Sequence, residues 1–122
     1  MTLSRHALGR EGEALAAAEL ERRGFTVVDR HYVCRGGELD LVVLEGDCLC
    51  FVEVRSRGPS PIDPLETISG PKRRRVVHAA RDWLRRYGGP PRPVRFDVLA
   101  VRSAPGGGFE LELVRNAFDA AE

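Results

Sequence analysis

Hydrophobic residues recur along the chain at helical spacing in two segments and in a denser, strand-like pattern elsewhere. Small and apolar residues at helical spacing predict one helix over residues 4–23, which Gly24 ends. An apolar stripe that includes Val76, Ala80 and Trp83 predicts a second helix over residues 71–87, with Ser69 as its candidate N-cap. The opposite face of this second helix is rich in arginine, so we expect only one side of it to be packed.

The remaining segments predict strands, because they are rich in the β-branched, aromatic and apolar residues of buried sheets. They cover residues 25–35, 38–44, 48–55, 94–101 and 109–114. Gly46 and Asp47 lie between the second and third of these strands and suit a two-residue hairpin turn with glycine at its first central position. That turn sets the register of the hairpin and places Asp40 opposite Glu53.

The order αβββαββ predicts an α/β fold in which helices pack on a mixed central sheet of about five strands. A length of 122 residues, of which 43% are hydrophobic, indicates a single domain over residues 1–122. No apolar run approaches the ~20 residues that span a bilayer, and the first ten residues do not resemble a signal peptide. Cys34, Cys48 and Cys50 are odd in number, which indicates a reducing compartment. We therefore expect a cytoplasmic protein with no membrane partner.

The net charge of +1 hides an uneven distribution of charge. Residues 1–54 contain six basic and ten acidic side chains, whereas residues 55–95 contain eleven basic and three acidic ones. This pattern is typical of a polyanion-binding surface beside a carboxylate site, and a solvated helix face explains it equally well. Among the 19 basic residues, Lys72 is the single lysine.

Two carboxylates that face each other in a sheet repel and lose solvation, so Asp40 and Glu53 need a positive partner. Mg²⁺ or Mn²⁺ suits them, because such hard cations bind one or two carboxylates and keep positions for water and phosphate oxygens. Arg55 adds a positive group on the same face as Glu53. Glu13 adds a third acid, on the helix stripe where a packed residue is expected. Each acid alone is more simply a solvated or capping residue, but the four residues together favour a functional site.

Several motifs follow one another along nearly the whole chain. They are Gly9-x-x-Gly12-Glu13, Gly37-Glu38-Leu39-Asp40-Leu41, Phe51-Val52-Glu53-Val54-Arg55-Ser56-Arg57, Ser69-x-x-Lys72, Arg95-Phe96-Asp97-Val98 and Asn116-Ala117-Phe118. In this order they resemble the YraN-like family of small bacterial proteins, which is assigned to the restriction-endonuclease-like superfamily.

The resemblance implies a restriction-endonuclease-like core and a metal-dependent nuclease site. The pattern of such sites is Asp, then Glu-x-Lys on adjacent strands, with a glutamate on the first helix as in the similar archaeal Holliday junction resolvases. The resemblance thus implies that Asp40 and Glu53 are metal ligands, that Glu13 is an accessory ligand, and that residue 55 carries the catalytic cation.

This chain departs from the family pattern at Arg55, where lysine is usual. Arginine stays charged in proteins, so Arg55 can orient a hydroxide or stabilise a phosphorane but is a poor general base. Lys72, near the start of the second predicted helix, is a candidate for a displaced catalytic cation. A phosphate contact at the helix end is the simpler interpretation of Lys72.

We therefore predict a Mg²⁺- or Mn²⁺-dependent nuclease acting on DNA rather than RNA, including branched or structured DNA. The alternative is a non-catalytic nucleic-acid-binding or interaction module that retains the nuclease fold. Both functions need basic side chains for backbone contacts. The candidates are Arg57, Lys72, Arg73, Arg74, Arg75 and Arg81. A symmetric homodimer is expected if the target is a four-way junction, because two strands are then cut.

Overall fold

The computed structural model describes residues 5–57 and 68–120, with the backbone alone at residues 5–10 and 57. Two helices and five strands follow one another in the order predicted. They are α1 (Arg5–Arg22), β1 (Thr26–Cys34), β2 (Gly37–Glu45), β3 (Cys48–Arg57), α2 (Gly70–Tyr87), β4 (Val94–Ser103) and β5 (Phe109–Phe118). The α/β class is confirmed, and a restriction-endonuclease-like core is consistent with this arrangement. The predicted start of the first helix at residue 4 lies outside the described residues.

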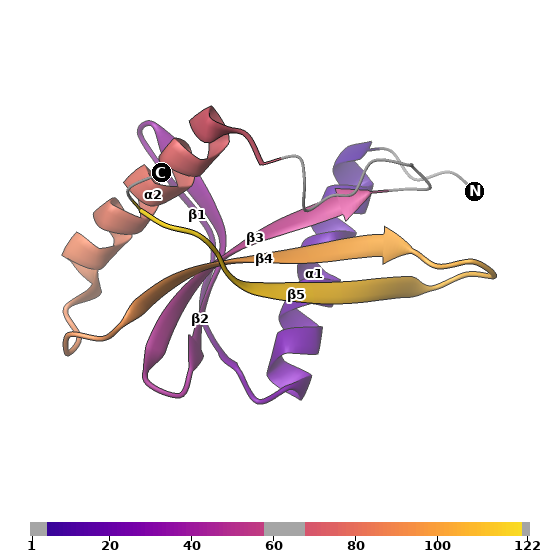
Figure 1. Cartoon of the computed structure of the whole chain (residues 1–122), viewed down its shortest axis with the longest axis horizontal. Helices are drawn as coiled ribbons and strands as arrows, with labels where there is room; N and C mark the ends of the chain where they lie inside the picture. Colours follow the sequence, from indigo (N-terminus) through magenta and orange to yellow (C-terminus); the bar gives the residue numbers. More distant parts are fainter. Residues whose placement is uncertain (1–4, 58–67, 121–122) are drawn as a thin grey trace.

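The strands form one mixed sheet in the order β1-β2-β3-β4-β5. β3 and β4 run parallel, and the other neighbouring strands are antiparallel. Parallel neighbours need a crossover connection, and α2 lies in the segment that links β3 to β4. Figure 1 shows the twisted sheet with α2 and α1 on different sides of it.

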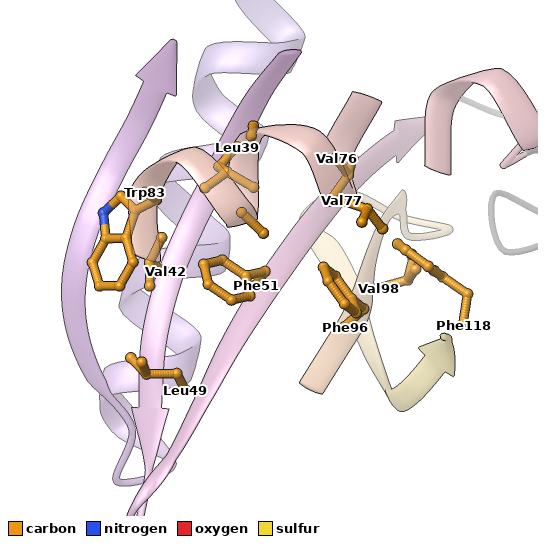
Figure 2. Close-up of a cluster of buried hydrophobic side chains, with 12 residues drawn as sticks. Leu39, Val42, Leu49, Phe51, Val76, Val77, Trp83, Phe96, Val98 and Phe118 are labelled. Carbon is orange, nitrogen blue, oxygen red and sulfur yellow. The ribbon is translucent and has the colours of Figure 1, made fainter. Parts of the chain in front are cut away.

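Each helix covers its own face of the sheet with a separate apolar cluster. On the α2 face, Trp83 packs with Phe51 and Phe96 (Figure 2). On the α1 face, small residues such as Ala16 and Ala17 pack against the opposite face of β2 and β3. The sheet is therefore covered on both faces, which explains why its central strands are apolar along most of their length.

The start of α2 has the cap predicted from the sequence. Ser69 is the N-cap, and its Oγ accepts a hydrogen bond from the backbone N–H of Lys72 at 3.2 Å. Pro71 occupies the first turn, where its missing N–H is tolerated. The helix ends at Gly88, whose φ of 68° is left-handed. Lys72 consequently lies in the first turn of a well-defined helix.

A fully buried carboxylate ties β4 to β5. Asp97 accepts two hydrogen bonds from Arg95, both of 2.8 Å, and one of 2.9 Å from the backbone N–H of Asn116. Asp97 lies where the pairing of β4 and β5 shifts its register, and Asn116 has a left-handed φ of 54°. Arg95 also donates to Glu45 at the end of β2. This network joins three strands and compensates the buried charge of Asp97.

Neither helix in the described part of the chain is long and apolar enough to span a membrane. The three cysteines are free thiols.

We expect Asp97→Ala to lower the free energy of unfolding by about 3 kcal/mol, because it leaves Arg95 partly buried with one carboxylate fewer. Urea denaturation measures this loss. Glu112→Ala is the matched control, since Glu112 forms an exposed ion pair with Arg102 and its removal should cost less than about 0.5 kcal/mol. Equal losses in the two variants would contradict a stabilising role for the buried network.

Candidate functional site

The hairpin between β2 and β3 has the predicted register. Its five pairs run from Glu45 opposite Cys48 to Leu41 opposite Val52. Gly46 has a φ of 61°, which glycine adopts without the steric cost that other residues bear. The turn residue that the sequence singled out therefore sets the alignment of the two strands that carry Asp40 and Glu53.

The regular alternation of side chains on β2 breaks at Asp40. Leu39 belongs to the apolar cluster on the α2 face, whereas Leu41 belongs to the cluster on the α1 face. Residues two apart on a regular strand share a face, so the backbone is irregular between them. On β1, His31 lies between the partners of Leu39 and Leu41 and has a left-handed φ of 50°.

Asp40 consequently projects into the place where the pairing of β2 and β3 ends. Its Oδ2 accepts a hydrogen bond of 2.8 Å from the backbone N–H of Val54. We predicted Asp40 to lie directly across from Glu53 on one regular face. Instead, the last backbone pair is Leu41 with Val52, and the Asp40 carboxylate bonds to β3 one residue beyond Glu53.

Glu53 is nearly inaccessible to solvent, with 4% of its surface exposed. The ammonium nitrogen of Lys72, on α2, lies 3.2 Å from Glu53 Oε1. Burial raises the pKa of Glu53 to about 8, and the negative charge of Asp40 adds to this shift while Lys72 opposes it. At neutral pH Glu53 therefore holds a proton more readily than an ordinary glutamate does.

Glu13 reaches Asp40 from α1. A Cβ on the preceding residue, Gly12, would lie 2.0 Å from Ser56 Oγ and 3.2 Å from Ser56 Cβ, so glycine lets α1 approach β3 this closely without displacing the Ser56 side chain. Burial raises the pKa of the half-buried Glu13, and the charge of Asp40 together with a hydrogen bond to it raises the pKa further. Asp40 thus interacts with Glu13 from one helix layer and with Glu53 on β3.

Arg55 is half-buried and lies two residues beyond Glu53 on β3, where it pairs with Ala100 of β4. Residues two apart on a regular strand share a face, so alternation along β3 places Arg55 on the face of Glu53. A cavity of about 270 Å³ lies between the start of β2 and the first turns of α2. Its lining residues are Gly37, Glu38, Lys72, Arg75 and Val76. Lys72 therefore contacts Glu53 and also forms part of the cavity wall.

No group of three or more His, Cys, Asp or Glu side chains within residues 5–57 and 68–120 is arranged to enclose a metal ion. Asp40 and Glu53 still fit a hard cation, because Mg²⁺ commonly uses one or two carboxylates and completes its shell with water and phosphate oxygens. Glu13 interacts with Asp40 and is placed to support such a site indirectly.

The predicted nucleic-acid contacts differ in exposure. Arg74, Arg75 and Arg81 are exposed on α2, whereas Arg73 is half-buried, with its Nε inaccessible and without a hydrogen-bond partner among the described residues. The side chain of Arg57 lies outside the described residues. Arg74, Arg75 and Arg81 form a basic face that we call the α2 arginine face. This face starts at the cavity of about 270 Å³, which Arg75 helps to line.

A second cavity, of about 540 Å³, lies farther along α2, where the helix meets the β1–β2 turn. Arg35, Arg85, Arg86 and His78 contribute to its lining, together with Asp82, which pairs with Arg85 and Arg86. We did not predict Arg35 as a site residue. It belongs to a turn far from α2 in sequence, so no periodicity along the chain connects it with the α2 arginine face.

Comparison with known proteins gives a family but no activity. A family model described as "Uncharacterised protein family UPF0102" matches residues 12–101. The chain is 53% identical over 103 residues to a UPF0102 protein of Anaeromyxobacter dehalogenans, covering 84% of this chain and 77% of that protein. It is 44% identical over 113 residues to a UPF0102 protein of Rhodococcus jostii, covering 92% and 96% of the two chains. A UPF0102 protein of Pseudomonas aeruginosa is 43% identical over 115 residues, with 92% of each chain covered.

We expect Glu53→Gln to raise the free energy of unfolding of the metal-free protein by about 1 to 2 kcal/mol at pH 7.5. With its pKa raised to about 8, Glu53 keeps a proton at pH 7.5 that the unfolded chain releases, and this difference costs stability. Glutamine removes that cost, and its oxygen can still accept a hydrogen bond from Lys72. Urea denaturation measures the gain, with the exposed Glu38→Gln as control, for which we expect a change within about 0.5 kcal/mol. A destabilised Glu53→Gln variant would show that the carboxylate is a structural group whose charge is already balanced.

Proposed function

We propose that this chain, which belongs to the uncharacterised protein family UPF0102, is a metal-dependent nuclease that hydrolyses phosphodiester bonds in DNA. The observation that carries the proposal is the meeting of three acidic side chains from α1, β2 and β3 around Asp40. Lys72, which pairs with Glu53, also lines a cavity at the start of a basic helix face. Acids whose pKa is raised by burial and by a neighbouring carboxylate are typical of sites that bind a cation together with an anionic substrate.

Asp40 and Glu53 would hold Mg²⁺ or Mn²⁺, with Glu13 as an accessory group. When bound, such a cation lowers the pKa of water and offsets negative charge on a phosphate. The hydrogen bond from Val54 fixes the Asp40 carboxylate, and contact with α1 brings Glu13 beside it. Arg55 stays charged and so stabilises a developing phosphorane electrostatically rather than acting as a base.

The α2 arginine face supports a nucleic-acid substrate. The 18 residues of α2 extend about 27 Å, a length that follows the backbone over several nucleotides. Cavities lie near both ends of this face. Within residues 5–57 and 68–120, each described Phe, Tyr and Trp side chain is buried or half-buried, so none of them forms a fully exposed platform for unpaired bases. Backbone contacts and DNA shape, rather than base sequence, would then select the substrate.

The second candidate function is a binding module that retains this fold without cleavage. Arg55 favours it, because the usual catalytic lysine is replaced. The two functions share the α2 arginine face and differ in what the acids do. If the protein binds DNA without cleaving it, there is no metal-dependent cleavage for Asp40 to support, and Asp40 is not needed for binding.

We expect cleavage in a labelled panel of duplex, single-stranded, flapped and four-way DNA and of RNA, with Mg²⁺ or Mn²⁺. Asp40→Asn should reduce the cleavage rate at least about 100-fold with DNA binding retained, because it removes a metal ligand but keeps an oxygen that accepts from Val54. Mn²⁺ should raise the Tm of the wild-type protein and not that of Asp40→Asn. Gel-based cleavage and thermal denaturation measure these effects.

Glu112→Gln is the matched control, because it removes an exposed carboxylate on β5, which β4 separates from β3, and should behave as wild type. Salt-sensitive binding without cleavage under either metal would replace the nuclease by the binding module. If four-way DNA is the best substrate, the protein should form a dimer in solution, which light scattering measures.

We expect the double variant Arg74→Ala/Arg75→Ala to bind duplex DNA about ten-fold more weakly, to a similar extent for different sequences. Each lost phosphate contact should make the slope of log K against log salt shallower by about 0.9, so two contacts give about 1.8. Fluorescence anisotropy across a salt series measures both quantities.

The control for charge alone is Arg22→Ala/Arg30→Ala, which removes two exposed arginines outside the α2 arginine face. It should leave the salt slope nearly unchanged. The same slope change in both double variants would mean that net charge, and not the α2 arginine face, determines binding.

A further inference from the structure

The single lysine of the chain lies at the junction of the acids, the cavity and the α2 arginine face. Lys72 is fixed at its backbone by the Ser69 cap, and its side chain extends to Glu53 Oε1, 3.2 Å away. It also lines the cavity of about 270 Å³. A phosphate that entered this cavity would therefore meet an ammonium group already placed beside the acids.

Lys72 is half-buried, with 23% of its side chain exposed, while the Glu53 side chain is 5% exposed. An ion pair of this kind differs from the surface pairs on α2, such as Arg85 with Asp82, in which the arginine is 71% exposed. Partial burial strengthens the attraction between the charges and makes their position more definite. The Lys72 ammonium group therefore forms a partly buried ion pair with the Glu53 carboxylate.

Arg55 and Lys72 differ in side-chain flexibility and in how their positive charge is distributed. Arg55 belongs to a central strand of the sheet and carries a planar, delocalised charge. Lys72 carries a compact charge on a flexible stem of four carbons at the start of a helix. Only the lysine can exchange readily between a carboxylate oxygen and a phosphate oxygen, because its ammonium has three equivalent donors that need no particular plane.

We propose that Lys72 is a catalytic residue whose ammonium group leaves Glu53 when a divalent cation binds and then contacts the scissile phosphate. This inference rests on the proposed nuclease function. It adds a cation from a helix to the charge of Arg55, which stands on the strand where the resemblance implies a lysine. In the metal-free protein, Lys72 holds the Glu53 carboxylate in place of the metal.

The bonding changes of the reaction leave Lys72 protonated throughout. A bond forms between the attacking water oxygen and phosphorus, and the bond between phosphorus and the leaving sugar oxygen breaks. The proton lost by water passes to solvent, and the leaving oxygen takes a proton from solvent. Lys72 donates hydrogen bonds to the phosphate oxygens as their negative charge increases, which lowers the energy of the transition state.

Competition for Glu53 gives this proposal a test that does not depend on cleavage. If Lys72 occupies a carboxylate oxygen that the metal also uses, its removal frees that oxygen. Lys72→Met retains most of the length of the side chain without its charge. This variant should therefore bind Mn²⁺ several-fold more tightly than the wild-type protein in the absence of DNA, as measured by calorimetry.

The experiment compares Lys72→Met with the wild-type protein in three measurements: Mn²⁺ affinity, DNA affinity without metal, and single-turnover cleavage. We expect tighter Mn²⁺ binding, less than about a three-fold change in DNA affinity, and a cleavage rate reduced about 100-fold, as for loss of one transition-state donor. Adding Arg55→Lys to Lys72→Met should restore cleavage at least about ten-fold. Arg22→Met, which also removes one positive charge, should match the wild type in all three measurements.

The outcomes separate this proposal from the nuclease proposal. If the wild-type protein cleaves and Lys72→Met cleaves within about three-fold of it, Lys72 is not catalytic and the nuclease function stands. If DNA affinity falls as far as the cleavage rate, Lys72 is a binding contact only, and the proposal is wrong. If no protein cleaves, the nuclease proposal fails, and the catalytic role of Lys72 fails with it.

Unchanged Mn²⁺ affinity in Lys72→Met overturns the exchange at Glu53 in every case. Lys72→Gln replaces Lys72→Met if the methionine variant does not fold.

Discussion

The candidate site depends on one hydrogen bond, from the backbone of Val54 to the Asp40 carboxylate. A strand that loses its neighbour normally leaves backbone donors that need another partner. Here a side chain takes over where the last backbone pair of β2 and β3 ends. The same interaction holds a negative charge between Glu13 and Glu53, so the geometry that satisfies the backbone also brings the acids together.

Two buried carboxylates, Asp97 and Glu53, differ in how the fold compensates their charge. Asp97 accepts a bidentate pair of bonds from Arg95 and another from the backbone of Asn116, so its charge is compensated within the fold. Glu53 is almost as deeply buried, yet its compensation by Lys72 is opposed by the charge of Asp40. Burying such a charge costs stability unless a further cation arrives. The cation proposed for Asp40 and Glu53 would relieve this cost when bound.

The sequence predicted the elements well because each has a local signal. The Gly46 turn predicted the register of the hairpin, and Ser69 with Pro71 predicted the start of α2. The break in alternation at Asp40 could not be predicted, because it depends on an irregular backbone opposite His31 on another strand. The contact between Lys72 and Glu53 also has no local signal, since it requires the packing of α2 on the sheet. The strand pairing of β2 with β3 thus predicted that Asp40 and Glu53 lie close together, but the sequence did not predict the position of the Lys72 ammonium group.

Placing the working cation on α2 would couple chemistry to the docking of that helix. A Cβ at Gly37 would lie 2.2 Å from the backbone oxygen of Arg75, so α2 and the start of β2 are in close backbone contact. This contact fixes the first turns of α2, and with them the base of the Lys72 side chain, relative to the acids. Arg75 itself lies on the α2 arginine face that would bind nucleic acid. Substrate binding and the positioning of Lys72 therefore act on the same turns of one helix, whereas a cation on β3 would be held by the sheet alone. A strand lysine would be rigid and independent of binding, but Lys72 is placed where phosphate contacts and the catalytic charge can be engaged together.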